Sequence, residues 1–482
     1  MLFNSLSFCG FFLLVTVLYY VLPWRLRWKM LLAASCLFYM AFIPAYILIL
    51  FGTILIDYSM GILIARSAGR RRLVYLQISI LSTCLVLFVF KYFNFFAMTG
   101  RELQGILGTP QTFPITHIIL PIGLSFHTFQ GLSYVIEVYR GKQVPERHLG
   151  IYALYVMFFP QLVAGPIERP QNMLHQFYED HCFKLANLAN GLTLIGWGFF
   201  QKMVIADRAA IYVNNAYGHW STSGGLTLFV ATVLFAVQIY ADFSGYSCIA
   251  VGCARVLGIQ LTTNFNHPYF STSLGEFWKR WHISLSTWFR DYVYIPLGGN
   301  RGSVSRHYLN LLITFTISGL WHGANWTFAV WGLYNGLLLV LENYLTSLNW
   351  RLPRNFIGLI LRRALTVGSI CFGWIFFRAP NLEAALGIIR RIAVDTSLTL
   401  SSIKVSMIPF SGDSSSIVIG TVTCLLIAIM LLLEFGAESD YRGAKELLRG
   451  SLSFQFATTL IIFESVMLFG VLRASAFIYF QF

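Results

Sequence analysis

The chain has 482 residues, of which 57% are hydrophobic, 16% aromatic and only 11% charged, and its mean hydropathy is +0.66. Soluble domains usually carry about 25% charged residues, so this composition excludes an ordinary soluble protein and indicates one that crosses a membrane several times. A net charge of +14 would suggest nucleic-acid binding in a soluble protein. Here the Lys and Arg residues gather in short loops between apolar blocks, which is typical of cytoplasmic loops and gives no reason to expect a nucleic-acid partner.

The eight cysteines are scattered without CxxC spacing, so neither a disulfide framework nor a zinc site is indicated. The first apolar block, residues 6–22, follows no basic region and has no small-x-small cleavage site. It therefore predicts a retained helix rather than a removable signal peptide.

A spanning helix needs about 20 apolar residues, and by that measure the chain contains roughly eleven to thirteen spanning or re-entrant helices. The loop 23–29 holds three basic residues and the residues before 6 hold none, which places the N-terminus outside and the loop in the cytoplasm. Residues 31–64 are too long for one span and contain Pro44 near their middle, which predicts two short helices that meet on the outer side. The basic segment 66–72 then lies in the cytoplasm, and the spans 73–97 and 118–138 continue the alternation.

The segment FFPQLVAGPIERP, residues 158–170, places three prolines and a glycine inside an apolar run. Proline interrupts a helix, and non-helical backbone is tolerated at membrane depth only where it is packed in protein or lines a cavity. The sequence therefore predicts a broken or re-entrant segment. The later block 225–257 contains Asp242, either as a hydrogen-bonded packing group, which we favour, or as part of a cavity wall.

Residues 273–297, SLGEFWKRWHISLSTWFRDYVYIPL, differ from the spans because they mix aromatic and basic residues. One face of a helix would carry residues at helical spacing, namely Trp278, His282, Leu285 and Phe289. Three basic residues, Lys279, Arg280 and Arg290, would lie elsewhere on the same helix. This mixture predicts a helix at the membrane interface.

One ionisable side chain, His322, stands within the stretch 317–336, ISGLWHGANWTFAVWGLYNG. Ionisable residues in a membrane are costly and by default mark a substrate or proton pathway; a helix-packing histidine is the alternative. The glycines of this stretch allow close approach of neighbouring backbone, and its indole rings would wall a narrow slot. These glycines and tryptophans are Gly319, Gly323, Gly332, Trp321, Trp326 and Trp331.

The other predicted apolar segments are residues 191–205, 309–320, 328–341, 364–377, 417–435 and 454–472. Residues 378–415 form the longest polar connection. The loop after 417–435 carries Arg442, Lys445 and Arg449, which places it in the cytoplasm and the C-terminal tail 473–482 outside. The basic residues of the connection 378–415 then fall outside, where long loops obey the charge rule less strictly. With no soluble segment and no internal repeat, residues 1–482 are expected to form a single integral-membrane domain.

Three segments, WKRWHISLSTWFRDYVYIPLGG, FFPQLVAGPIERP and SGLWHGANW, together resemble the membrane-bound O-acyltransferase family, in particular its branch with the membrane subunit of alginate O-acetyltransferase. The sequences MLFNS and FIYFQF at the two ends are also similar to that branch. The resemblance implies an all-α polytopic fold, with a ring of tilted helices around a thin central cavity and the catalytic motifs in residues 158–336. It also implies acyl transfer across the membrane, and it assigns the family's catalytic histidine to His322 and a second motif histidine to His282.

O-acyl transfer needs a base that takes a hydroxyl proton as the oxygen attacks a thioester carbonyl, and a route for that proton to the leaving thiolate. An imidazole, with a reference pKa of about 6.5, can serve both needs near neutral pH. We assign His322 as the general base and His282 as a positioning or proton-donating partner, with interfacial packing as the alternative for His282. Trp321, Asn325 and Trp326 are expected to contact the substrate.

The expected donor is acetyl-CoA, and no bound cofactor is expected. Lys279, Arg280 and Arg290 would bind the phosphates of coenzyme A on the cytoplasmic side, although anchoring to lipid headgroups explains them equally well. An acyl carrier protein of the D-alanyl type is the alternative donor. A transporter or flippase is the alternative class, because broken helices with Asp242 and His322 at mid-membrane also suit a translocation path.

Two other mechanisms are disfavoured. Neither His282 nor His322 has a His, Cys, Asp or Glu three or four positions away, the spacing that lets ligands on one helix share a metal ion. The chain also contains no GxSxG motif, which a serine hydrolase of the α/β type would need.

The last six residues, FIYFQF, contain four aromatic residues and an isoleucine, whereas chain ends are usually polar. They are either an aromatic anchor at the membrane interface, or a carrier in which Tyr479 accepts the acyl group at His322 and passes it outward. The resemblance favours the carrier, because FxYxxF is similar to the C-terminal motif of bacterial envelope acylation systems. The expected partner is a periplasmic or surface O-acetyltransferase of the SGNH type. The expected acceptor is a cell-envelope or secreted polysaccharide, and the expected location is the bacterial inner membrane.

Overall fold

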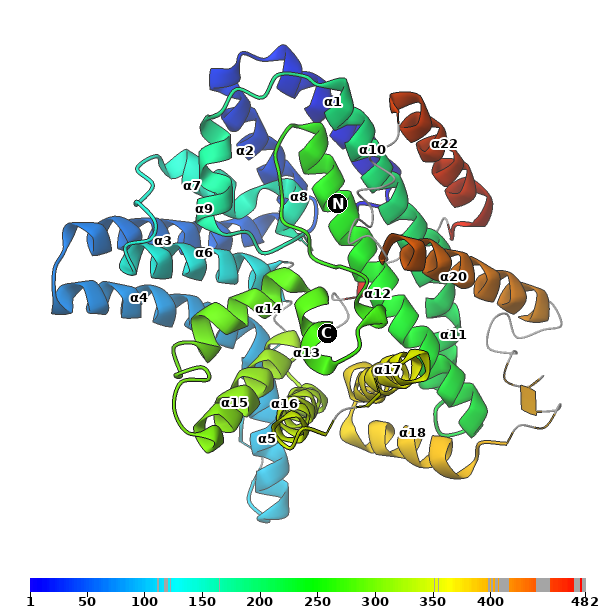
Figure 1. Cartoon of the computed structure of the whole chain (residues 1–482). Coiled ribbons are helices and arrows are strands. Elements are labelled where there is room, and N and C mark those ends of the chain that lie inside the picture. The colour runs from blue at the N-terminus through cyan, green and yellow to red at the C-terminus, as the bar shows by residue number, and fades with distance from the viewer. Residues whose placement is uncertain are drawn as a thin grey trace. The chain divides into compact units, whose positions relative to one another are not determined.

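The computed structural model describes most of the chain as helices and their connections (Figure 1). The described residues are all except 111, 117–119, 122, 164, 351, 354, 398, 400–401, 404–405, 407–415, 439–450, 472–476 and 479–482. All regular secondary structure in this described part is helical. The predicted cytoplasmic residues Arg442, Lys445 and Arg449, and the predicted carrier Tyr479, lie outside the described residues.

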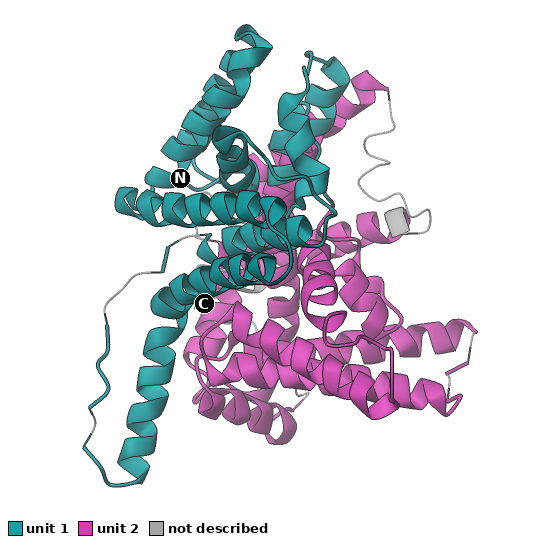
Figure 2. Cartoon of the chain, turned by 90° about the vertical axis from the view of Figure 1, so that its left-hand side faces the viewer, with its two compact units in different colours: residues 1–191, 250–262 teal, residues 192–249, 263–482 magenta. Residues whose placement is uncertain are grey.

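Two compact units make up the chain, and each takes its residues from two separate stretches (Figure 2). Unit 1 contains Met1–Gly191 and Ala250–Thr262, and unit 2 contains Leu192–Ile249 and Thr263–Phe482. The helices α10 (Leu185–Phe199) and α12 (Gly225–Val256) contribute residues to both units. One integral-membrane domain over residues 1–482 stays a prediction.

Unit 1 is built from the N-terminal helices. α3 packs against α4 and α6, and α2 packs against α7. Pro44 separates α2 from α3, as predicted, because proline cannot continue the preceding helix. Its elements before α10 are α1 (Leu6–Val21), α2 (Trp24–Met40), η1 (Pro44–Tyr46), α3 (Ile47–Arg66), α4 (Arg70–Leu87), η2 (Phe88–Tyr92), α5 (Phe93–Ile106), α6 (Leu124–Tyr139), α7 (Leu149–Met157), α8 (Phe159–Leu162), α9 (Pro170–Met173) and η3 (Leu174–Tyr178).

Six helical stretches in the described part are long and apolar enough to cross a membrane: Pro44–Arg66, Arg70–Ile106, Gly225–Val256, Phe356–Arg378, Val418–Gly436 and Leu452–Phe469. They confirm the predicted all-α polytopic membrane protein, since a span takes about 20 residues. The predicted number of roughly eleven to thirteen spanning or re-entrant helices stays a prediction. So does the ring of helices around a central cavity.

The proline-rich segment 158–170 is broken, as predicted, and α7, α8 and α9 are separate short helices around it. Side chains of unit 1 satisfy its backbone. The Phe159 N–H donates to Ser35 Oγ at 3.1 Å, and the Tyr155 hydroxyl donates to the Glu168 carbonyl at 2.9 Å. These bonds replace those of a continuous helix, which buried backbone requires.

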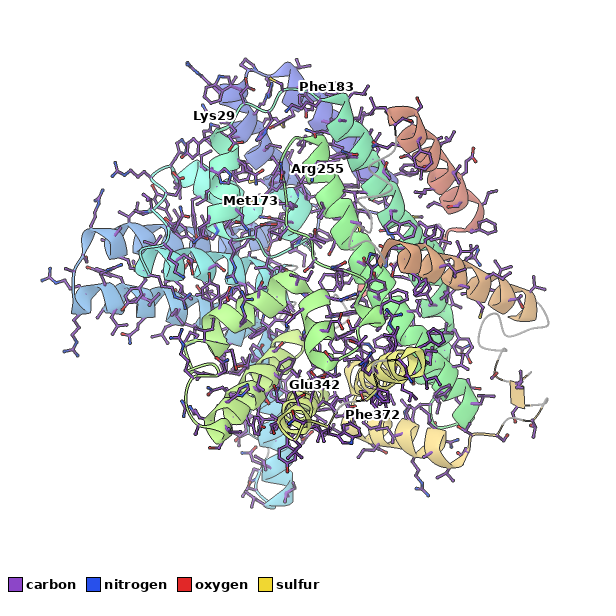
Figure 3. All side chains as sticks on the ribbon, viewed as in Figure 1. Lys29, Met173, Phe183, Arg255, Glu342 and Phe372 are labelled. Carbon is purple, nitrogen blue, oxygen red and sulfur yellow. The ribbon has the colours of Figure 1, made fainter. Side chains whose placement is uncertain are left out.

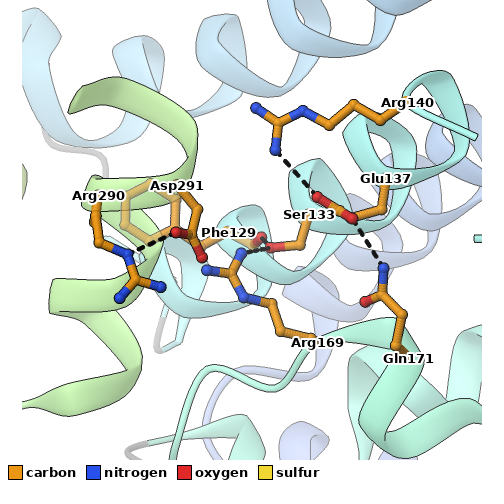
Figure 4. A network of polar contacts seen from close by, with 8 residues as sticks. All are labelled: Phe129, Ser133, Glu137, Arg140, Arg169, Gln171, Arg290 and Asp291. Atoms are coloured by element: carbon orange, nitrogen blue, oxygen red, sulfur yellow. Dashed lines mark hydrogen bonds and ion pairs between the residues drawn. The ribbon is translucent and has the colours of Figure 1, made fainter. Parts of the chain in front are cut away.

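A polar network ties the end of this segment to α6 (Figure 4). The Glu137 carboxylate accepts hydrogen bonds from Arg140 at 3.2 Å and from Gln171 at 2.9 Å. The Arg169 guanidinium donates to the Ser133 hydroxyl at 3.3 Å. Because ionised groups take part in each bond, the network holds α9 firmly against α6.

Unit 2 contains both predicted catalytic histidines, His282 and His322, whereas the predicted motif region 158–336 has residues in both units. The predicted polar connection 378–415 begins with a helix, α18, whose face at Ala384, Ala385 and Ile388 is buried. After α10, the elements are η4 (Phe200–Ala206), α11 (Asp207–Gly218), α12, η5 (Pro268–Phe270), α13 (Leu274–Arg280), α14 (Ile283–Phe289), η6 (Arg290–Tyr294), α15 (Val304–His322), α16 (Trp326–Ser347), α17 (Phe356–Arg378), α18 (Leu382–Val394), α20 (Ser416–Glu438) and α22 (Leu452–Phe469).

α15 and α16, which follow each other in the chain, form a tightly packed helical hairpin. A Cβ placed on Gly319 would lie 2.9 Å from the Cα of Gly332, and one on Gly332 would lie 3.1 Å from the Cα of Gly319. Further along, a Cβ on Gly336 would lie 3.2 Å from the Cα of Leu312. The close backbone approach predicted for residues 317–336 is therefore confirmed, and it fixes the end of α15.

We predict that Gly319→Ala lowers the free energy of unfolding by about 1–3 kcal/mol, because the added methyl group overpacks the hairpin. The matched control is Gly368→Ala on α17, where a Cβ meets nothing within 4 Å and alanine is the better helix former. Thermal unfolding of the purified protein in detergent measures both variants. Equal unfolding temperatures for Gly319→Ala and the unsubstituted protein would contradict the prediction.

Candidate active site

His322 is the last residue of α15, and Gly323 caps the C-terminal end of the helix. Its side chain is buried and surrounded by rings: the centroids of Trp321, Trp331 and Phe377 lie 5.0, 5.1 and 5.3 Å from that of the imidazole. The interplanar angles of 74°, 88° and 68° are those of edge-to-face packing. The ring cluster therefore holds the imidazole in one orientation and keeps water from most of it.

A carboxylate of α16 holds the start of α13 in place. Glu342 Oε2 accepts the Leu274 N–H at 2.6 Å, and Oε1 accepts the Gly275 N–H at 3.1 Å. Glu342 is labelled in Figure 3. The first N–H groups of a helix have no partner inside it, and the helix dipole favours negative charge there. This contact fixes α13, which carries Trp278 and Lys279, against α16.

The single interfacial helix predicted over residues 273–297 is wrong, because the helix breaks at His282. α13 ends at Arg280 and α14 begins at Ile283, and His282 between them has a φ of 43°, in the left-handed region. The break is held from outside the segment. The Ile283 N–H donates to the Asn264 carbonyl at 2.9 Å, and the Asn266 N–H donates to the Arg280 carbonyl at 2.9 Å.

The Asn264 amide also sets the tautomer of His282. The backbone N–H of Ser284 can only donate, and it lies 3.2 Å from Asn264 Oδ1, which identifies that atom as the amide oxygen. His282 Nδ1 lies 3.1 Å from the same oxygen, so Nδ1 carries the hydrogen. Burial lowers the pKa of His282 to about 3, so the ring is neutral at pH 7 and Nε2 holds a lone pair. Of the two roles predicted for His282, positioning fits this tautomer, because proton donation would need a further proton on Nε2.

His282 and His322 line one cavity of unit 2, with a volume of about 490 Å³. Binding sites for small molecules usually enclose about 300 to 1,000 Å³. Its walls come from α13, α14, η6, α15 and one residue of α16, Leu339. Besides the two histidines, its wall carries hydroxyl and cationic side chains of Ser286, Thr287, Tyr294, Thr314, Ser318, Lys279 and Arg290.

The structure therefore brings together four of the predicted site residues, His282, His322, Lys279 and Arg290. Arg280 does not line this cavity, and its guanidinium pairs instead with Glu276 at 2.5 Å. Successive side chains on an α-helix point about 100° apart, so when Lys279 faces the cavity its neighbour Arg280 points away from it. Binding of donor phosphates by Arg280 stays a prediction.

The three predicted substrate contacts near His322 do not line the cavity either: Trp321, Asn325 and Trp326. Trp321 packs against His322, and Asn325 caps α16 by accepting the Thr327 N–H at 3.0 Å. The Trp326 side chain is 48% exposed. Their contact with substrate stays a prediction.

The sequence analysis missed the hydroxyl groups of Thr314 and Ser318 in the cavity wall. Both precede His322 on α15 by multiples of four residues, so the three side chains lie along one face of the helix. This spacing could have identified both hydroxyl groups from the sequence, because residues four and eight positions before His322 lie on the same face of the helix.

Asp242 is a packing group, the interpretation we favoured from the sequence. Its Oδ1 pairs with the Lys202 ammonium at 2.6 Å, and its Oδ2 accepts the Ile478 N–H at 2.7 Å. Lys202 also pairs with Asp207 at 3.0 Å. All three charged side chains are buried. Ile478 and Phe477 are the described residues of the predicted tail motif.

The fold and the site define a multi-pass helical membrane protein with two buried histidines on one small-molecule cavity. The sequence profile of the membrane-bound O-acyltransferase family (MBOAT) matches residues 147–376, which include the whole cavity wall. The chain is 36% identical over 444 residues to the probable alginate O-acetylase AlgI of Pseudomonas aeruginosa, covering 92% of this chain and 82% of that protein. The chain therefore belongs to the membrane-bound O-acyltransferase family and is an O-acyltransferase.

Two further relatives have different names. The chain is 32% identical over 391 residues to the peptidoglycan O-acetyltransferase of Helicobacter pylori, covering 75% of this chain and 72% of that protein. It is 29% identical over 296 residues to the teichoic acid D-alanyltransferase of Bacillus subtilis, covering 57% and 73%. All three names describe transfer of an acyl group, so the predicted enzyme class is confirmed and the alternative of a transporter or flippase is set aside.

We predict that Asn264→Leu lowers the rate of acyl transfer at least about tenfold, because His282 loses the acceptor that fixes its tautomer. Asn264→Asp keeps an acceptor oxygen at Nδ1 and should retain more activity than Asn264→Leu. Asn343→Leu is the control, because Asn343 bonds only within α16, to the Leu339 carbonyl. Acyl release from a radiolabelled thioester by purified protein measures all three variants, and full activity in Asn264→Leu would contradict the tautomer argument.

Proposed function

We propose that the protein takes acetyl groups from a cytoplasmic thioester, acetyl-CoA, and delivers them across the bacterial inner membrane for O-acetylation of a cell-envelope or secreted polysaccharide. Relatives named for alginate and for peptidoglycan O-acetylation support both the acetyl group and the glycan acceptor. The relative named as a teichoic acid D-alanyltransferase supports the alternative, D-alanyl transfer from a carrier protein. We prefer acetyl because the matches to O-acetylating relatives cover more of the chain.

The observation that carries the proposal is the cavity that His282 and His322 share. In the proposed reaction an acceptor hydroxyl oxygen attacks the thioester carbonyl carbon while His322 takes the hydroxyl proton. Collapse of the tetrahedral intermediate breaks the C–S bond, and the His322 imidazolium returns the proton to the CoA thiolate. His282 stays neutral, and its Nε2 lone pair orients a hydrogen-bond donor within the cavity.

The cations on the cavity wall support a donor that carries phosphate. Lys279 and Arg290 line the same cavity as the histidines, and ammonium and guanidinium groups bind phosphate through charge-assisted hydrogen bonds. In bound acetyl-CoA, the phosphates would lie at these cations and the thioester would point toward His322. A 4′-phosphopantetheine group on a carrier protein has the same chemistry with one phosphate.

The first acceptor in this proposal is Tyr479, which lies outside the described residues. A phenol with a reference pKa of about 10 is easier to deprotonate than an aliphatic alcohol, and its ester is reactive enough to pass the acetyl group to a sugar hydroxyl. The thioester is made in the cytoplasm and the polysaccharide is modified outside, so only the acyl group needs to cross. A periplasmic or surface SGNH-type O-acetyltransferase would take the acetyl group from Tyr479.

We predict that His322→Gln lowers acetyl transfer by about 10²- to 10⁴-fold, the usual contribution of general acid–base catalysis. His322→Ala should be equally inactive. His219→Gln, at the C-terminal end of α11 and not in the cavity wall, is the matched control. CoA release and polymer acetylation are compared at equal amounts of membrane-inserted protein. Near-normal acetylation in His322→Gln would remove this histidine from the mechanism.

We predict that the double variant Lys279→Glu and Arg290→Glu raises the KM for acetyl-CoA more than it lowers kcat. This result is expected when the lost contacts bind the substrate and the transition state equally well. Steady-state kinetics of the purified enzyme test this. Arg306→Glu, an exposed cation of α15 away from the cavity wall, should leave KM unchanged. An unchanged KM in the double variant would place the phosphate site elsewhere.

We predict that Tyr479→Phe abolishes acetylation of the polysaccharide while the protein remains in the membrane, because phenylalanine keeps an aromatic anchor and lacks the nucleophile. Mass spectrometry of donor-treated protein, with the partner absent, should find acetyl on Tyr479 of the unsubstituted chain. Acetylation of polymer at the normal rate by Tyr479→Phe would leave the aromatic anchor as the role of the tail.

A further inference from the structure

The segment Phe477–Ile478 is held inside unit 2. Both side chains are buried, with exposed fractions of 0% and 1%. The Phe477 ring packs against two rings of α12, with centroids 4.6 Å from Tyr246 and 5.4 Å from Phe243. The Ile478 N–H donates to Asp242 Oδ2 at 2.7 Å. Two adjacent residues thus make two ring contacts and one hydrogen bond with the same helix.

The acceptor for this amide belongs to a buried group of three charges. Lys202 lies between two carboxylates, 2.6 Å from Asp242 and 3.0 Å from Asp207. Buried charges are costly unless they are paired and hydrogen-bonded. One ammonium balances one carboxylate, so the second carboxylate favours N–H donors, and the backbone amide of Ile478 is such a donor. The cluster therefore suits a peptide segment better than another anion.

The same helix connects this segment to the candidate active site. Asp242 and Tyr246 are four residues apart and contact the tail, while Phe243 is on the neighbouring row of α12. The Phe243 ring packs edge-to-face on His282, with centroids 4.5 Å apart, and it also contacts Phe477. A single phenylalanine thus touches both the tail and a histidine of the cavity wall.

We infer that the cluster of Lys202, Asp207 and Asp242 is a docking site for the chain's own segment Phe477–Ile478, and that docking positions the next residue, Tyr479, for acyl transfer. The positioning part rests on the carrier function proposed for Tyr479. Asp242 is a positioning residue, since it acts through a backbone amide and not on the substrate. The site recognises a buried aromatic ring at position 477 followed by a backbone N–H at position 478.

Hydrogen exchange tests the docking site directly. We expect deuterium exchange of the Ile478 amide to be about tenfold to a hundredfold faster in Asp242→Ala, from loss of a hydrogen bond to a charged group. Asp242→Asn keeps an acceptor oxygen and leaves Lys202 paired with Asp207, so the Ile478 amide of this variant should exchange at an intermediate rate. This variant replaces Asp242→Ala as the test if Asp242→Ala fails to fold. Thr232→Val removes a different buried polar group of α12, a hydroxyl that is hydrogen-bonded to Tyr217 at 3.0 Å, and should leave the exchange rate of the Ile478 amide unchanged. Unchanged exchange in both Asp242 variants overturns the docking site.

Acetylation of Tyr479 tests the positioning role. In Asp242→Ala we expect the rate of Tyr479 acetylation by acetyl-CoA to fall at least about tenfold with KM unchanged, with partial recovery in Asp242→Asn. Equal acetylation rates in Asp242→Ala and the unsubstituted protein, together with faster amide exchange, overturn the positioning role. If Tyr479 of the unsubstituted protein is never acetylated while exchange still depends on Asp242, the carrier function fails and the docking site stands.

Discussion

Inside a bilayer, polar groups have no water to bind, so the protein itself must satisfy each of them. This constraint explains where the described structure departs from continuous helix. At the broken segment 158–170, Ser35 and Tyr155 supply the missing hydrogen bonds. At the break before α14, Asn264 supplies them, and its side chain also holds His282. At the second break, the residue that closes the gap in the backbone also fixes one of the two cavity histidines.

Much of the fold followed from local features of the sequence. Low charge and long apolar blocks predicted a multi-pass helical protein, and prolines predicted the breaks at Pro44 and in 158–170. The glycines of residues 317–336 predicted close backbone approach, which Gly319 and Gly332 make. Each of these inferences needs only neighbouring residues, because steric and helical rules act over a few positions. None of the three tryptophans predicted to wall a narrow slot lines the cavity, because Trp321 and Trp331 pack on His322 and Trp326 is half-exposed.

Features that depend on distant residues were not predictable. The left-handed conformation at His282 follows from Asn264, 18 residues earlier, so helical periodicity alone suggested one continuous helix. The backbone amide that Asp242 binds lies 236 residues away at Ile478, and no local pattern points to it. The choice between Lys279 and Arg280 as a cavity residue depends on how α13 is rotated, and Glu342 and the break at His282 set that rotation.

The cavity wall draws all its residues from one stretch, between Gly275 and Leu339. Two side chains that hold His282, Asn264 and Phe243, come from earlier in the chain and do not line that wall. A mutagenesis screen that measures only activity would therefore record substitutions at these two positions as active-site defects. Their effect would arise from a misplaced imidazole and not from a lost contact with the ligand.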